Sequence, residues 1–99
     1  MAGEGLACDI TDEGAVFDTV KTIAAKGPII GLVNNAGLHE HKPTKDLTAA
    51  DFERIMRINT TAVLIASRAV YPHLCAAGGG LIVNIGSFPP FSYEYTIRI

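Results

Sequence analysis

The sequence predicts an α/β fold built on a parallel sheet. Three short apolar runs, at about residues 6–10, 29–34 and 81–86, are each too short for a helix and are followed by polar residues. Two longer segments, at about residues 12–26 and 49–76, carry apolar residues at helical spacing and separate these runs. Strands that alternate with helices in this order form parallel sheets with right-handed crossovers.

The first strand and helix are delimited by polar residues. The run at 6–10 ends at a turn in which Thr11 or Asp12 can cap the helix that follows. The apolar residues of this helix are Val16, Phe17, Val20, Ile23 and Ala24. Gly27 and Pro28 end the helix, because neither residue continues it well.

The second strand leads through a polar loop into the long helix. Residues 29–33 form a continuous apolar run, which predicts a strand buried on both faces. Thr48 is a suitable N-cap, with Asp51 in the acidic first turn. An apolar stripe then runs for about six turns, through Phe52, Ile55, Met56, Val63, Ala66, Val70 and Leu74. Pro72 is a potential kink, and three glycines end the helix before the third strand.

Composition argues against several classes of function. The 99 residues make one domain at most, with 48% hydrophobic and 18% charged residues. The net charge is -2 and the Lys and Arg residues are scattered, which argues against nucleic-acid binding. No apolar run approaches the ~18 residues of a membrane span, and the start lacks the pattern of a signal peptide. Cys8 and Cys75 are far apart and are expected to be reduced, which favours a cytoplasmic location.

Four short motifs with polar residues lie at the ends of the predicted strands or in the helix between them. They are Asp9-Ile10, then Asn34-Asn35-Ala36-Gly37, then Asn59 in the long helix, and finally Asn84-Ile85-Gly86-Ser87. Ligands of open α/β sheets bind beyond the carboxyl ends of the strands, where three of these motifs lie. In order and spacing the four motifs resemble the short-chain dehydrogenase/reductase family up to Ser87. The resemblance implies a partial Rossmann-like fold and an NAD(P)-dependent oxidoreductase.

The resemblance assigns cofactor contacts to six residues. It implies that the Asp9 carboxylate binds the adenine amino group and that Ile10 presents its backbone N–H to the ring. It places Asn35, Ala36 and Gly37 along the cofactor ribose and Ile85 at the cofactor, while Asn34 braces the sheet. From the residues alone, the favoured interpretation of Asp9 is an ordinary turn residue before the next helix. The resemblance does not distinguish NAD from NADP.

The same resemblance gives two residues catalytic roles. Asn59 would hold a water in a proton relay, and Ser87 would hydrogen-bond the carbonyl of the substrate. Taken without the family, an Asn in a helix commonly bonds to a nearby backbone carbonyl, and a Ser at a strand end commonly caps a helix. His39 and His41 flank Glu40 in a loop, but a metal site would need further ligands, so no metal is expected.

Two parts of the family pattern are absent from these residues. No Gly-rich turn between a strand and a helix is present, and neither Tyr93 nor Tyr95 is followed by Lys four positions on. We therefore expect residues 1–87 to be a partial NAD(P)-binding domain and 88–99 to be a tail unlike the family. The chain alone should bind cofactor weakly and should not turn over an alcohol or carbonyl substrate.

Two further expectations concern the chain as an isolated molecule. It could instead be a non-catalytic isoform or remnant that pairs with full-length subunits, or with itself, through the helix at 49–75. In the family's strand order, the strand at 6–10 would be separated from that at 29–33 by two vacant positions. Unpaired backbone groups are costly when buried, so the chain should be marginally stable or should pair these two strands directly.

Overall fold

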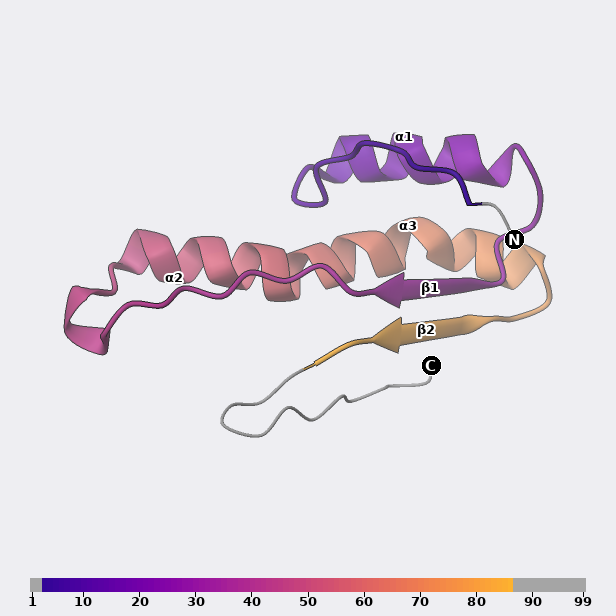
Figure 1. Ribbon diagram of the computed structural model, residues 1–99. Coiled ribbons are helices and arrows are strands. Elements are labelled where there is room, and N and C mark those ends of the chain that lie inside the picture. The colour runs from indigo at the N-terminus through magenta and orange to yellow at the C-terminus, as the bar shows by residue number, and fades with distance from the viewer. Residues whose placement is uncertain (1–2, 87–99) are drawn as a thin grey trace.

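The computed structural model describes residues 3–86 and shows an α/β arrangement with two parallel strands. Strand β1 (Gly31–Asn34) pairs with β2 (Leu81–Asn84), with Gly31 opposite Leu81 and Asn34 opposite Asn84. Both strands run in the same direction, so their carboxyl ends lie at the same end of the sheet (Figure 1). The α/β class and the parallel pairing of the runs at 29–34 and 81–86 are confirmed.

Helix α1 (Glu13–Ala24) precedes β1 and begins where the sequence predicted. The Asp12 side chain accepts a hydrogen bond from the Ala15 backbone N–H at 3.1 Å, which satisfies one of the free N–H groups of the first turn. Val16 and Val20 are buried and join the core against the second helical segment. The apolar spacing of this helix is therefore explained by one buried face.

The predicted helix at 49–76 is continuous but changes its winding in the middle. It consists of α2 (Ala49–Met56), a π-helical turn η2 (Arg57–Thr61) and α3 (Ala62–Ala76). A short 3₁₀ turn, η1 (Thr44–Asp46), lies in the loop before it. The N-cap forms as expected, because Thr48 and Asp51 exchange side-chain to backbone hydrogen bonds in a capping box. Pro72 lies within α3, whereas the change in winding occurs at η2.

The prediction of a strand at 6–10 is wrong, because the structure has no strand there. Residues 3–9 form neither a helix nor a strand, and the chain there runs alongside α1 (Figure 1). The direct pairing of this segment with residues 29–33 is also wrong, since β1 bonds only to β2 among residues 3–86. A strand needs a hydrogen-bonding neighbour, and no described strand lies next to this segment.

The core lies between the helices and one face of the sheet. Helix α3 packs on α1 and on both strands. The buried apolar side chains come from α1, α3, β2 and the segment before β1, and Leu32 of β1 is partly buried against them. These side chains are Val16, Val20, Ile29, Ile65, Ala69, Val70, Leu74 and Ile82. No described element covers the other face, where Val33 is 62% exposed. The expectation that this strand is buried on both faces is therefore wrong for residues 3–86.

Within residues 3–86, no helix is both long enough and apolar enough to cross a bilayer.

Candidate functional site

The carboxyl ends of β1 and β2 are joined by paired asparagines. The Asn34 side-chain amide donates to Asn84 Oδ1 at 2.8 Å, and the Ile85 N–H donates to the Asn34 carbonyl at 3.0 Å. The two amides occupy opposite positions in the parallel register, so their hydrogen bond follows from the strand pairing. The predicted bracing role of Asn34 is thus visible in the structure, and Ile85 lies directly beside it.

Asn59 in η2 holds the backbone that leaves β1. Its Oδ1 accepts from the Leu38 N–H at 2.7 Å, and its Nδ2 donates to the Leu38 carbonyl at 2.8 Å. Gly37 lies directly against this amide, because a Cβ added at Gly37 would be 3.5 Å from Asn59 Oδ1. The turn after β1 is therefore fastened to the helix by the residue that interrupts its apolar stripe.

The Asp9 carboxylate organises the turn before α1. Its Oδ1 accepts from both the Thr11 hydroxyl at 2.7 Å and the Thr11 N–H at 2.9 Å. These two hydrogen bonds, with a smaller contribution from the charge of Arg57, lower the pKa of Asp9 below its usual value. The Asp12 N–H closes the same turn on the Asp9 carbonyl at 3.1 Å. The turn-residue interpretation of Asp9 is thus confirmed, while its exposed carboxylate remains open to solvent.

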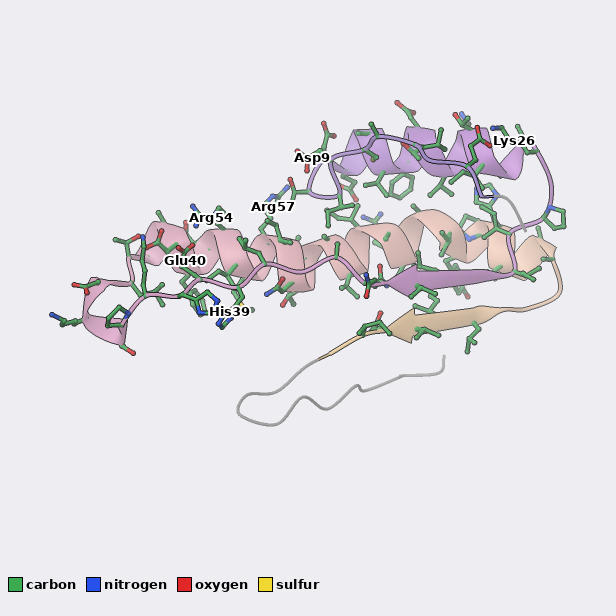
Figure 2. The ribbon with its side chains drawn as sticks, viewed as in Figure 1. Asp9, Lys26, His39, Glu40, Arg54 and Arg57 are labelled. Atoms are coloured by element: carbon green, nitrogen blue, oxygen red, sulfur yellow. The ribbon has the colours of Figure 1, made fainter. Side chains whose placement is uncertain are left out.

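Arg57 connects the Asp9 turn to η2. Its guanidinium Nη2 donates to the Thr11 carbonyl at 2.6 Å, across 46 positions of the sequence. Figure 2 shows Arg57 on the helix next to the turn that carries Asp9. Arg57 could not be predicted from the sequence as a site residue, because a single Arg on the polar side of a helix has no distinguishing pattern. π-helical turns occur frequently at functional sites, and this one contacts both polar loops.

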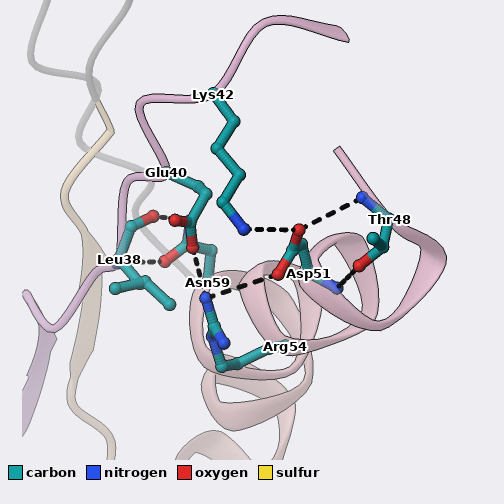
Figure 3. A network of polar contacts seen from close by, with 7 residues as sticks. All are labelled: Leu38, Glu40, Lys42, Thr48, Asp51, Arg54 and Asn59. Atoms are coloured by element: carbon teal, nitrogen blue, oxygen red, sulfur yellow. Dashed lines mark hydrogen bonds and ion pairs between the residues drawn. The ribbon is translucent and has the colours of Figure 1, made fainter. Parts of the chain in front are cut away.

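Charged pairs attach the loop after Leu38 to α2 (Figure 3). Lys42 bonds to Asp51 Oδ2 at 3.0 Å, and Glu40 pairs with Arg54. Asp51 is only 8% exposed, and its pKa is lowered to about 2, first by the Thr48 backbone hydrogen bond and then by Lys42. The loop that borders the candidate site is therefore fixed to the start of the long helix.

The structure brings most of the predicted site residues to one end of the sheet. Asp9 and Ile10 reach η2 through Thr11, while Gly37 reaches it through Asn59. Asn35 and Ala36 are exposed between β1 and Gly37, and Ile85 follows β2. Ser87 lies outside the described residues, as does the tail at 88–99.

Two histidines lie close together in the loop after Leu38. The rings of His39 and His41 meet edge to face with centroids 4.2 Å apart. Within residues 3–86 there is no group of three or more side chains that could hold a metal ion. A tetrahedral site normally needs that many protein ligands.

The polar end of the sheet has groups that fit an adenine nucleotide. Asp9 uses one carboxylate oxygen in its turn, which leaves the second as an acceptor for an amino group. Among residues 3–86, no acceptor meets the backbone N–H of Ile10. Ala36 and Gly37 are small and exposed, so a ligand can approach the backbone there.

Comparison with known proteins identifies one family. Residues 3–92 match the family model described as short chain dehydrogenase. Gluconate 5-dehydrogenase of Gluconobacter oxydans (strain 621H) is 40% identical over 80 residues, which are 80% of this chain and 31% of that protein. The chain spans about a third of the length of the curated relatives it matches.

Two solved structures share the fold at moderate sequence identity. A metagenomic short-chain oxidoreductase in complex with NADP has a TM-score of 0.76 and 32% identity, over 87% of this chain and 39% of that chain. A gluconate 5-dehydrogenase from Burkholderia cenocepacia J2315, in complex with NADP and tartrate, has a TM-score of 0.74 and 34% identity. The match covers 80% of this chain and 31% of that chain.

Proposed function

Because the chain belongs to the short-chain dehydrogenase family, we propose that it forms part of the active site of an NAD(P)-dependent oxidoreductase. The reaction would be hydride transfer between the nicotinamide and an alcohol or carbonyl of a small molecule. The observation that carries this proposal is the meeting of the Asp9 turn, Gly37 and Asn59 around η2. This group of residues lies at the carboxyl ends of parallel strands, where nucleotides bind in open α/β sheets.

The cofactor contacts would come from two backbone turns. The free oxygen of Asp9 would accept from the adenine amino group, and the Ile10 N–H would donate to the ring. Asn35, Ala36 and Gly37 would line the ribose, with Ile85 on the neighbouring strand end. When bound, the nicotinamide supplies or accepts the hydride. These residues hold and orient the cofactor, and they leave the choice between NAD and NADP open.

Asn59 would take part in proton transfer through the atoms that its structural bonds leave free. Its amide already bonds to the Leu38 backbone at both Oδ1 and Nδ2. An Asn amide has two N–H donors, so one Nδ2 hydrogen is available to a water molecule. Ser87, which would orient the substrate carbonyl, is the second proposed catalytic residue.

We expect the isolated 99-residue chain to bind cofactor weakly and not to catalyse the reaction. Hydride transfer to a carbonyl places negative charge on its oxygen, and a proton donor at that oxygen must neutralise the charge. The family uses a Tyr with a Lys four positions later, whereas the residues four after Tyr71, Tyr93 and Tyr95 are Cys75, Ile97 and Ile99.

A binding experiment tests the site directly. NADH and NADPH would be titrated into the 99-residue chain, with NMR resonances of Asp9, Ile10 and Gly37 followed during the titration. We expect weak saturable shifts at these residues and no oxidation of NADH when a carbonyl compound is added. Gly37→Val should abolish the shifts by filling the approach to the backbone, whereas Gly5→Val, where a Cβ meets nothing within 4 Å, should retain them. Shifts spread evenly over the surface would contradict the proposed site.

The long helix would pair with a second copy of the chain through an exposed apolar stripe. Leu64 is 60% and Tyr71 65% exposed, and Phe52 and Met56 are also exposed. Each residue of an α-helix advances by about 100° around the axis, and a π turn contains one extra residue. That extra residue rotates Leu64 and Tyr71 back to the side of the helix that carries Phe52 and Met56, so these four residues form the exposed stripe. The non-catalytic alternative, an isoform that pairs with full-length subunits, would use the same surface.

Sedimentation velocity distinguishes pairing from a monomeric chain. Leu64→Glu should shift a dimer to the monomer, because the charge lies within the stripe. Ile23→Glu on α1 is the matched control, since Ile23 is also an exposed apolar residue but lies outside the stripe. A monomeric wild-type chain at high concentration would contradict self-pairing.

A cytoplasmic location completes the proposal, because Cys8 and Cys75 are both free thiols.

A further inference from the structure

The π turn η2 carries two side chains that reach in different directions. Arg57 donates to the Thr11 carbonyl at 2.6 Å, and Asn59 bonds twice to the Leu38 backbone. Residues two apart on a helix do not face the same way, so Arg57 and Asn59 can contact loops on different sides of the long helix. The turn therefore contacts both of the loops to which the proposed function assigns cofactor binding.

The position of the Arg57 bond matters for the Asp9 turn. Thr11 donates both its N–H and its hydroxyl to Asp9 Oδ1, so Thr11 and Asp9 form one unit. Its carbonyl, on the other side of the residue, is the group that Arg57 holds. The bond is charge-assisted, and such bonds are roughly twice as strong as neutral ones. Tilting the turn would break it and would also move the N–H of Ile10.

A second arginine gives an internal comparison. Arg68 on α3 pairs with Glu13 of α1 at 2.5 Å, and its guanidinium lies 5.8 Å from the centre of the Phe17 ring. Both arginines thus tie the long helix to the region of α1, and both are exposed. Only Arg57 contacts the turn that contains Asp9. Removing either arginine should therefore weaken the attachment of the long helix to the region of α1. Removing Arg57 alone should also displace the turn that contains Asp9.

We propose that Arg57 is a positioning residue for the adenine nucleotide. It acts through Thr11, and fixes the Asp9 carboxylate and the Ile10 N–H relative to Gly37 and Asn59. The inference rests on the proposed function in one respect, the identity of the ligand. The hydrogen bond from Arg57 to the turn, and its effect on the turn, can be tested without any ligand.

The test compares Arg57→Met, Arg57→Lys and Arg68→Met in the 99-residue chain. Met keeps the apolar stem but removes every donor, whereas Lys restores a cationic donor. In Arg57→Met we expect altered NMR shifts and faster amide exchange at Thr11 and Asp12, and a higher carboxyl pKa at Asp9. Arg57→Lys should return these values most of the way to those of the wild type. Arg68→Met should leave them unchanged.

Binding of NADH and of ADP-ribose gives the second readout. Arg57→Met should weaken both by roughly tenfold, the range expected for losing one charge-assisted hydrogen bond, and Arg57→Lys by about twofold. Binding that Arg57→Met leaves unchanged would overturn the role of Arg57 while retaining the proposed function. Equal effects of Arg57→Met and Arg68→Met at the turn would also overturn it. Failure of the wild-type chain to bind either ligand would refute the proposed function together with the nucleotide role of Arg57.

Discussion

The two ends of the small sheet are held together by different kinds of interaction. At the amino ends of the strands, Gly80 packs so tightly that an added Cβ would lie 2.6 Å from Leu74 Cδ2 and 2.7 Å from the Ile30 carbonyl oxygen. At the carboxyl ends, directional hydrogen bonds connect Asn34 with Asn84 and Asn59 with Leu38. Close apolar packing at one end supports stability, and polar groups at the other end are available for a ligand.

The same contrast holds for the cavities and charges of the molecule. A shallow depression of about 190 Å³ lies at the amino ends, lined largely by small or apolar residues such as Ala24, Ile29 and Ala76. His73 is its one polar lining side chain among residues 3–86, whereas the other end carries Asp9 and Arg57 in contact through Thr11. Substitutions at the amino ends should therefore change stability, and substitutions at the carboxyl ends should change the site.

The largest expected effect is that of Leu74→Ala at the packed end. Leu74 is 6% exposed and contributes to the core that α3 shares with the sheet. Truncation of a buried leucine leaves a cavity and should lower the free energy of unfolding by about 2–5 kcal/mol. Urea denaturation followed by circular dichroism measures this. Leu64→Ala, on the exposed side of the same helix, should change the stability of the monomer, measured at a protein concentration too low for pairing, by no more than about 0.5 kcal/mol. Similar losses in the two variants would contradict the contrast between the buried and the exposed side of the helix.

Gly80→Ala should be the next most damaging change. The added Cβ meets the Leu74 side chain and the Ile30 backbone at distances that real structures avoid, so the helix end must move away from β1. Overpacking of this kind costs about 1–3 kcal/mol. Thermal melting should show a lower midpoint than that of Gly3→Ala, where the new Cβ meets nothing within 4 Å. Chemical shifts at Asp9 and Asn59 should stay close to those of the wild type, since the site lies at the other end.

The contrast between the ends explains which features could be predicted from the sequence. Periodicity located both helices and the two paired strands, because burial on one face repeats along each helix. The polar residues at the ends of the predicted strands, such as Asn34 and Asn84, also pointed to the carboxyl ends. The supposed strand at 6–10 failed, because an apolar run becomes a strand only beside a partner. The π turn and the bond of Arg57 to Thr11 depend on tertiary geometry that no local pattern encodes.

Asn34→Ala should separate bracing at the carboxyl ends from packing at the amino ends. It leaves Asn84 Oδ1 without its half-buried donor, which should cost about 1 kcal/mol. The double variant Asn34→Ala/Asn84→Ala should cost less than the sum of the two single variants, because neither amide is then left alone. Chemical denaturation of all four proteins in the cycle measures the coupling. Strict additivity would show that the two amides do not stabilise each other in solution.

The smallest effect concerns acid stability at the start of the long helix. The Thr48 backbone hydrogen bond and Lys42 lower the pKa of Asp51 to about 2 in the folded chain, against about 3.8 for the ordinary carboxyl. A depressed pKa means that the folded state favours the carboxylate, so its stabilising contribution is complete above pH 4. The contribution should decline as the pH falls from about 4 to about 2 and should be absent below that range. Urea midpoints of the wild type should therefore converge on those of Asp51→Asn as the pH falls. A constant difference between the two proteins across this range would mean that Asp51 titrates at its ordinary pKa, and that the capping box and the Lys42 pair are not formed in solution.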